Sequence, residues 1–354
     1  MTNLVTPRSL GYRMPAEWAP HRATWLSWPH SQDNWPTQLE QVRAVWVQMI
    51  VELSAVEQVG LLVNDESAER DVAARLKRAG AALDRVLFLR IPTTDVWMRD
   101  YGPTFVTRST TDSPLALNDW VFNGWGGKYE AYEEDERVAK EIAALLKIPV
   151  FDHPVVLEGG SIEVNGAGTC LTTEQCLLNK NRNPNLTRQG IETFLEDTLG
   201  VAQIIWLGEG VAGDDTDGHI DDIARFVDPR TVVCIREANS QDENYRRLEE
   251  NFERLRSATD QDGNHLNIVT LPCPAAIFYD GSRLPASYAN FYIANEIVLV
   301  PVFDDPHDGQ ALGVLRDLFP DREVIGLRCN EVVVGLGAIH CVTQQEPRIF
   351  PPRT

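Results

Sequence analysis

A cysteine near the end of the chain lies in a segment whose composition suits nucleophilic chemistry. Residues 335–347, GLGAIHCVTQQEP, place Cys341 after two glycines and before a polar run. Gly335 and Gly337 allow the backbone to approach a ligand closely. A cysteine thiolate can form a covalent intermediate with an electrophilic carbon when a base lies nearby. Cys341 is therefore a candidate nucleophile, although most buried cysteines only pack as small apolar side chains.

The candidate base lies far upstream, in the acidic segment 214–222, DDTDGHIDD. If residues 218–222 are extended, His219 and Asp221 share one face and offer a proton shuttle beside a fixed negative charge. His340 is adjacent to Cys341, but successive residues of an extended strand face opposite sides. We therefore expect His219 to be the base and His340 to have a structural role.

Two further carboxylates stand where strands are expected to end. Asp100 lies in residues 97–103, WMRDYGP, where a strand breaks into a turn, and Glu158 precedes two glycines. Alone, each is typical of an ion pair or a turn. Together with Cys341, His219 and Asp221, they indicate covalent thiol catalysis on a positively charged substrate.

Two binding motifs are excluded by their spacing. Aligning Gly218 with the invariant glycine of a calcium loop puts Gly213 at the first ligand position and Ala224 at the bidentate glutamate position. In the glycine-rich loop that resembles a phosphate loop, the first glycine falls on Phe122 and Tyr129 replaces the required Ser or Thr.

The cysteines do not suggest a metal centre. The six of them contain no Cys-x-x-Cys pair and no zinc-like spacing. His219 has no second histidine or cysteine nearby in sequence, which is a weak signal for a transition metal. We expect no metal, and reduced, mostly buried thiols in a cytoplasmic protein.

Composition excludes several classes of partner. The chain has 354 residues, 43% hydrophobic and 24% charged, as in ordinary globular proteins. Its net charge of -20 argues against nucleic acid and anionic membranes, which are bound through Lys and Arg. The charge suits a small cationic substrate, but it also serves solubility alone. No apolar run approaches a membrane span, and we expect no secretory signal in residues 1–10.

The elements that must position these side chains recur along the chain. A hairpin pattern with an Asn-Gly or similar turn is expected at residues 161–171, 224–235 and 290–300. Apolar spacing predicts helices at residues 39–53, 136–146, 188–199 and 243–255. The pattern repeats about every 65 residues, so such modules could close in a ring around a central site. The alternative is an ordinary α/β sheet with coincidental spacing.

In their order, these motifs resemble the agmatine deiminases of the Porphyromonas-type peptidylarginine deiminase family, within the guanidine-modifying superfamily. The resemblance runs almost end to end. It is carried by residues 14–18 (MPAEW), 24–29 (TWLSWP), 97–103, 158–161 (EGGS), 172–184 (TTEQCLLNKNRNP), 217–221 (DGHID) and 339–341 (IHC).

The resemblance implies an α/β fold: a five-module, pseudo-symmetric α/β propeller (pentein) with a central active site, forming a single domain over residues 1–354. It also implies roles for the candidate residues. Cys341 would be the nucleophile and His219 the general acid and base. Asp100 and Asp221 would hold a guanidinium, and Glu158 would complete the polar set. No cofactor is implied, and the oligomeric state, a homo-oligomer included, stays open.

The expected reaction is hydrolysis of agmatine to N-carbamoylputrescine and ammonia, a step of polyamine biosynthesis toward putrescine. Asp215 would bind the far amine of this small cationic guanidine, Trp97 would cover its aliphatic arm, and Gly337 would bring backbone close to it.

The sequence departs from the agmatine deiminase pattern in two places. Leu336 and Ala338 replace the usual glycine and asparagine, and the loop after residue 127 looks shorter than in many relatives. Three alternatives therefore stay open: a deiminase of peptidylarginine or another arginine derivative, an amidinotransferase, and a non-catalytic binding propeller.

Overall fold

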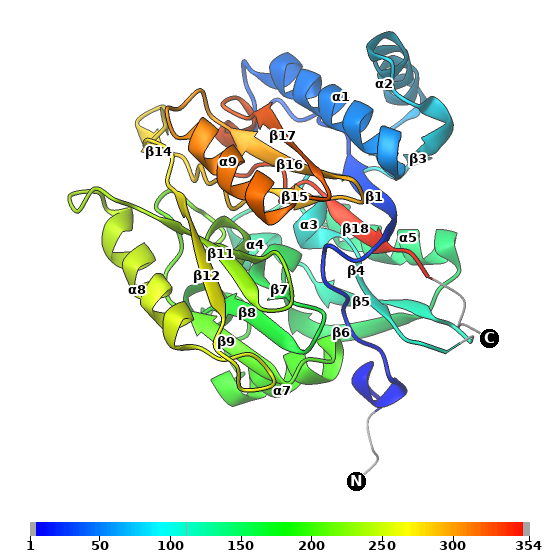
Figure 1. Ribbon diagram of the computed structural model, residues 1–354. Coiled ribbons are helices and arrows are strands. Elements are labelled where there is room, and N and C mark those ends of the chain that lie inside the picture. Colours follow the sequence, from blue (N-terminus) through cyan, green and yellow to red (C-terminus); the bar gives the residue numbers. More distant parts are fainter. Residues whose placement is uncertain (1–4, 111, 350–354) are drawn as a thin grey trace.

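The chain alternates strands with helices, and its sheets lie around a common centre with the longer helices on their outer sides (Figure 1). The structure is a computed structural model that describes residues 5–110 and 112–349. Within these residues the strands form five sheets of three or four strands and one separate two-stranded hairpin. The predicted α/β class is therefore confirmed.

The five larger sheets share one strand arrangement. In each, one strand pairs antiparallel with a neighbour on one side and parallel with a neighbour on the other. The parallel neighbour follows in sequence after a helix, as a parallel pair requires a crossover. The strands are β18 (Gln344–Pro347), β1 (His21–Ser27), β2 (Gln58–Val63) and β3 (Val86–Arg90); β4 (Thr104–Thr107), β5 (Leu115–Val121) and β6 (Val150–Val156); β7 (Glu163–Val164), β8 (Thr169–Thr173) and β9 (Gln203–Leu207); β10 (Ala224–Phe226), β11 (Thr231–Arg236) and β12 (Asn267–Pro272); and β15 (Tyr292–Ile293), β16 (Ile297–Val302) and β17 (Glu323–Arg328).

The α-helices of the described residues are α1 (Leu39–Val56), α2 (Glu66–Ala79), α3 (Met98–Tyr101), α4 (Gly124–Gly127), α5 (Val138–Leu146), α6 (Glu174–Leu177), α7 (Arg188–Leu199), α8 (Asn244–Ser257) and α9 (Asp308–Leu318). The small hairpin is β13 (Phe278–Tyr279) with β14 (Ser282–Arg283). All four predicted helices are confirmed, as α1, α5, α7 and α8. The three predicted hairpins are confirmed as the pairs β7–β8, β10–β11 and β15–β16.

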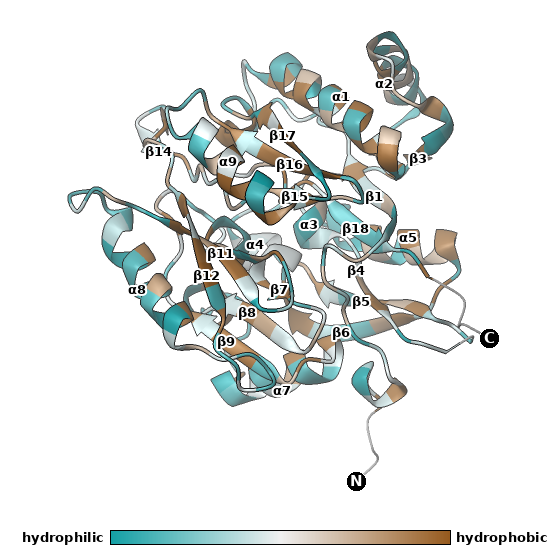
Figure 2. Cartoon of the chain, viewed as in Figure 1, coloured by the Kyte–Doolittle hydropathy of each residue, from teal (hydrophilic) through white to brown (hydrophobic). Residues whose placement is uncertain are grey.

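The strands are more buried than the helices. Hydrophobic residues concentrate in the sheets, whereas α2 and α8 carry mostly hydrophilic residues (Figure 2). In α8 the buried positions Asn244, Leu248, Asn251 and Leu255 form one stripe at helical spacing, so the rest of that helix faces solvent. Within residues 5–110 and 112–349, none of the helices combines the length and apolar composition that crossing a bilayer requires.

Pairing of the two ends of the chain fixes the position of Cys341. Strand β18 begins three residues after this cysteine and pairs antiparallel with β1, near the start of the chain. Cys341 itself lies in a turn, so the extended strand assumed around His340 and Cys341 is wrong. Thr343 explains the turn, since its hydroxyl donates to the carbonyls of Ile339 (3.0 Å) and His340 (3.1 Å).

Two other local predictions are also wrong. Residues 220–222 form a 3-10 helix instead of extended chain, because the Asp214 carboxylate accepts hydrogen bonds from the backbone N–H groups of Gly218 (2.8 Å) and His219 (3.1 Å). Asp100 lies within the short helix α3 and not at a strand end. Strand alternation therefore does not place His219 and Asp221 on one face.

Candidate active site

One cavity, of about 380 Å³ including the space that opens to solvent, gathers many of the predicted residues. Those that line it are Trp97, Asp100, Asp215, Gly337 and Cys341. Directly behind this lining, and almost completely buried, lie Glu158, His219 and Asp221. Segments from across the sequence thus meet at one place.

The Cys341 thiol is buried among acidic groups. Its Sγ lies 3.7 Å from Asp221 Oδ2 and accepts a hydrogen bond from Asn290 Nδ2 at 3.0 Å. Burial raises the pKa of this thiol well above its usual range, and the carboxylates of Asp221, Asp222 and Asp100 raise it further. Without a bound cation the sulfur is therefore held as a thiol.

His219 lies against Asp100, with its Nδ1 3.5 Å from Asp100 Oδ1. Gly160 makes this approach possible, because a Cβ there would lie 2.5 Å from His219 Nδ1 and 2.7 Å from Asp100 Oδ1. Burial alone would lower the pKa of His219, but Asp100, Cys176 and Glu158 outweigh it and raise the pKa well above the usual value. The ring is therefore an imidazolium at neutral pH.

Three carboxylates surround these groups. Asp100 accepts hydrogen bonds from Trp125 Nε1 (2.8 Å) and Gly160 N (3.1 Å), and burial raises its pKa to about 6. Glu158 accepts a hydrogen bond from Arg182 Nε at 2.8 Å. Glu158 Oε2 and Asp221 Oδ1 are buried without a hydrogen-bond partner among the described residues. Unpartnered carboxylate oxygens at this depth indicate a site that a hydrogen-bond donor completes.

Asp215 also lines the cavity. Its Oδ2 accepts a hydrogen bond from the Tyr129 hydroxyl at 2.5 Å, and burial raises its pKa. Residues 123–130 supply Trp125 and Tyr129 to the cavity lining, and Tyr129 lies in the loop after residue 127 that we expect to be shorter than in many relatives. Leu336, which the sequence predicts to replace a glycine of the family pattern, also lines the cavity and adopts a left-handed backbone at φ 70°.

Trp97 packs in the hydrophobic core and also lines the cavity. Its ring lies over Gly337, where a side chain would collide with it, and its centroid is 6.0 Å from that of Trp35. Trp97 is only 6% exposed, yet it lines the cavity. It is thus both a core residue and a wall of the site.

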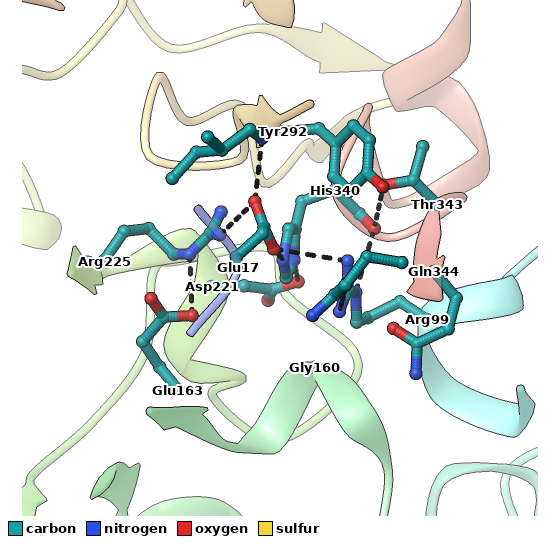
Figure 3. A network of polar contacts seen from close by, with 12 residues as sticks. Glu17, Arg99, Gly160, Glu163, Asp221, Arg225, Tyr292, His340, Thr343 and Gln344 are labelled. Carbon is teal, nitrogen blue, oxygen red and sulfur yellow. Dashed lines mark hydrogen bonds and ion pairs between the residues drawn. The ribbon is translucent and has the colours of Figure 1, made fainter. Parts of the chain in front are cut away.

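A buried polar network lies behind Cys341, centred on His340 (Figure 3). The Nδ1 of His340 is 2.7 Å from Asp221 Oδ2, and its Nε2 is 2.8 Å from Glu17 Oε2. Glu17 also pairs with Arg225 (2.8 Å) and Arg99 (3.4 Å). His340 is therefore bound to carboxylates on both sides, as expected of a structural residue, although the strand geometry used to predict this is wrong.

Sequence reasoning missed two residues that hold the site. Asn290 Oδ1 accepts hydrogen bonds from the backbone N–H groups of His340 (2.8 Å) and Cys341 (3.4 Å), while its amide nitrogen faces the sulfur. Glu17 links His340 to two arginines. Glu17 lies in the motif at residues 14–18 that carried the family resemblance, and this was the available signal for it.

Comparison with known proteins agrees with this geometry. The agmatine deiminase of Medicago truncatula is 40% identical over 97% of this chain and 98% of its own, and that of Stutzerimonas stutzeri is 40% identical over 99% and 100%. A solved agmatine deiminase of Enterococcus faecalis superposes with a TM-score of 0.90 at 33% identity, covering 97% of this chain and 98% of its own. The family model for Porphyromonas-type peptidyl-arginine deiminase matches residues 13–347. With a family match over nearly the whole chain and relatives this similar, the chain belongs to the Porphyromonas-type peptidyl-arginine deiminase family.

Proposed function

We propose that this protein is an agmatine deiminase, a hydrolase that converts agmatine and water to N-carbamoylputrescine and ammonia. The observation that carries the proposal is the charge of the cavity. Asp95, Asp100 and Asp215 line it together with Cys341, and none of the described lining residues is basic. Such a cavity suits a substrate that is cationic at both ends, whereas free arginine would need a basic partner for its carboxylate.

The proposed first half-reaction forms a covalent intermediate. Asp100 and Asp221 bind the N–H groups of the guanidinium and hold its carbon beside the sulfur. With the cation bound, the Cys341 thiol gives up its proton to solvent, and the resulting thiolate attacks this carbon. The His219 imidazolium then gives its proton to a departing nitrogen, ammonia leaves, and an amidino-thioether remains on the cysteine.

The second half-reaction consumes water. Neutral His219 takes a proton from a water molecule, whose oxygen attacks the amidino carbon. The carbon–sulfur bond breaks, the thiolate is expelled, and the remaining proton passes to solvent to leave the ureido product. Glu158, with its free oxygen near His219, stabilises the imidazolium that is present before the first half-reaction and again after the second.

We also propose that the five sheets are the modules of one pseudo-symmetric propeller domain spanning residues 1–354, with the site on its axis. The strand arrangement common to all five sheets supports this proposal. A cytoplasmic location is supported by the six cysteines, all of which are free thiols.

The choice of substrate is tested by measuring ammonia release from agmatine, arginine and a blocked arginine peptide. We expect the largest kcat/KM with agmatine. A larger value with the blocked peptide would assign the enzyme to peptidylarginine instead, and turnover only with an added amine acceptor would indicate an amidinotransferase.

The variant Asp215→Asn should lower kcat/KM for agmatine about tenfold or more, because a hydrogen bond to a charged group contributes about 1.5–3 kcal/mol. The matched control is butylguanidine, which lacks the far amine and should lose little. Steady-state kinetics with both compounds measure the difference. Equal losses of kcat/KM for agmatine and butylguanidine would show that Asp215 does not recognise the far amine.

Substrate should activate the nucleophile. Because burial and nearby carboxylates raise the pKa of the Cys341 thiol, alkylation by iodoacetamide should be slow at neutral pH and should accelerate only as pH rises toward that pKa. A non-reactive guanidinium ligand neutralises the carboxylates, so in its presence the alkylation profile should shift to lower pH. The measurement is the pseudo-first-order rate of alkylation against pH, with and without the ligand. The reagent must be small enough to reach the occupied site. Coinciding profiles would contradict substrate activation.

A further inference from the structure

His340 has an unusual pair of partners. Both ring nitrogens contact carboxylate oxygens, Asp221 Oδ2 at 2.7 Å and Glu17 Oε2 at 2.8 Å, and the side chain is 1% exposed (Figure 3). An ionised carboxylate only accepts hydrogen bonds, and a neutral imidazole has only one N–H. A neutral ring would therefore leave one of these buried contacts without a proton.

The Glu17 carboxyl is ionised in this position. Besides His340, its oxygens face Arg225 at 2.8 Å, Arg99 at 3.4 Å and the backbone N–H of Ile293 at 2.8 Å, all of which are donors. Burial alone would raise the pKa of Glu17, but Arg225, His340 and Arg99 hold it well below its usual range. His340 Nε2 must therefore carry a proton to satisfy this contact.

The balance of buried charges indicates that the other ring nitrogen of His340, Nδ1, also carries a proton. The buried charged groups joined to His340 through these contacts are three carboxylates and two guanidinium groups, from Glu17, Glu163, Asp221, Arg99 and Arg225. One more positive charge makes the set neutral, and uncompensated buried charge is costly. A second proton on the His340 ring supplies that charge at the point where two carboxylates face it.

We propose that His340 is an imidazolium, protonated on both ring nitrogens, and a positioning residue that keeps Asp221 ionised, with one oxygen free for the guanidinium. This assignment for His340 rests on the proposed role of Asp221 in substrate binding. His340 holds Asp221 Oδ2, while Oδ1 has no partner among the described residues. The two histidines thus have different tasks: His219 gives up its proton in each cycle, and His340 keeps it.

Nuclear magnetic resonance of the intact enzyme, with histidine labelled in the ring with ¹⁵N, reads this protonation state directly. Both ring nitrogens of His340 should be protonated at neutral pH, because each faces a carboxylate oxygen. His153 is an internal control, since burial lowers its pKa to about 4 and its ring should be neutral at pH 7. One unprotonated nitrogen on His340 at neutral pH would overturn the proposal. Because this readout needs no turnover, it is independent of the proposed activity.

Two substitutions test the consequence for Asp221. His340→Asn keeps a neutral donor near the Nδ1 position, whereas His340→Gln keeps one near Nε2. The other titratable or charged groups that face Asp221 are Cys341, His219, Asp100, Asp222 and Arg225. Loss of the imidazolium should raise the pKa of Asp221, so kcat/KM for agmatine should begin to fall at a higher pH as the solution is acidified.

We expect kcat/KM to drop about tenfold in His340→Asn and further in His340→Gln, mainly through KM, since Asn alone keeps a donor toward Asp221. A purely structural role would instead lower the yield of folded enzyme and leave the pH profile unchanged. An unchanged profile in folded variants would therefore contradict the proposal. If neither variant folds, the protonation measurement on the unmodified enzyme still decides.

Discussion

Replacing Cys341 by alanine should lower kcat for agmatine by about four orders of magnitude or more, as removal of a covalent nucleophile does in other enzymes. The reason is chemical, since no other described thiol lines the cavity. Ammonia release under saturating substrate measures the loss. Calorimetry should still detect agmatine binding, because the carboxylates that hold the guanidinium remain.

The matched control is Cys234→Ala. Cys234 is a buried thiol on β11 that packs in the hydrophobic core. We expect this variant to lose some stability, as cavity-forming core substitutions do, while kcat stays close to that of the unmodified enzyme. Residual turnover by Cys341→Ala within tenfold of the control would exclude Cys341 as the nucleophile.

Replacing His219 by glutamine should lower kcat by about two to four orders of magnitude, the usual contribution of a positioned acid or base. The imidazolium beside Asp100 would no longer protonate the departing nitrogen, and the later water attack would lack its base. Steady-state and single-turnover kinetics with agmatine measure both steps.

A substrate with a better leaving group separates the acid role from a general loss of structure. An S-methylisothiourea bearing the same aminobutyl arm expels methanethiol, which needs little protonation. Its amidino transfer to Cys341 should suffer much less from His219→Gln than the reaction of agmatine. Equal losses for both compounds would contradict the acid role. The exposed His265, replaced by glutamine, is the control variant.

Much of the fold could be predicted from the sequence, because residues close together in the sequence determine where its helices and turns begin and end. Helix α7 has the predicted bounds, since the Thr187 side chain caps its first turn and Gly200 ends it in a left-handed conformation at φ 69°. The hairpin β7–β8 follows in the same way from the side chain of Asn165, whose Oδ1 accepts hydrogen bonds from backbone N–H groups of the turn.

The candidate site was predicted less completely. The candidate side chains could be identified from residue type, and Asp100, His219, Asp221, Glu158 and Cys341 do lie together. Their local geometry could not be predicted from periodicity, because side chains such as Asp214 and Thr343 bend the backbone into turns.

The supporting residues depend on contacts between distant parts of the chain. Asn290 reaches Cys341 across 51 positions, and Glu17 reaches His340 across 323. No local pattern contains such pairs. A buried carboxylate or amide looks like an ordinary polar residue in the sequence until its partner is placed beside it.

The most direct test of the account is acid quenching during turnover of agmatine, followed by mass spectrometry of the digested protein. The peptide that contains Cys341 should gain the mass of agmatine less ammonia, and this species should appear and decay with the kinetics of the reaction. Turnover at full rate with no adduct on Cys341, or with the adduct on another residue, would contradict the covalent mechanism.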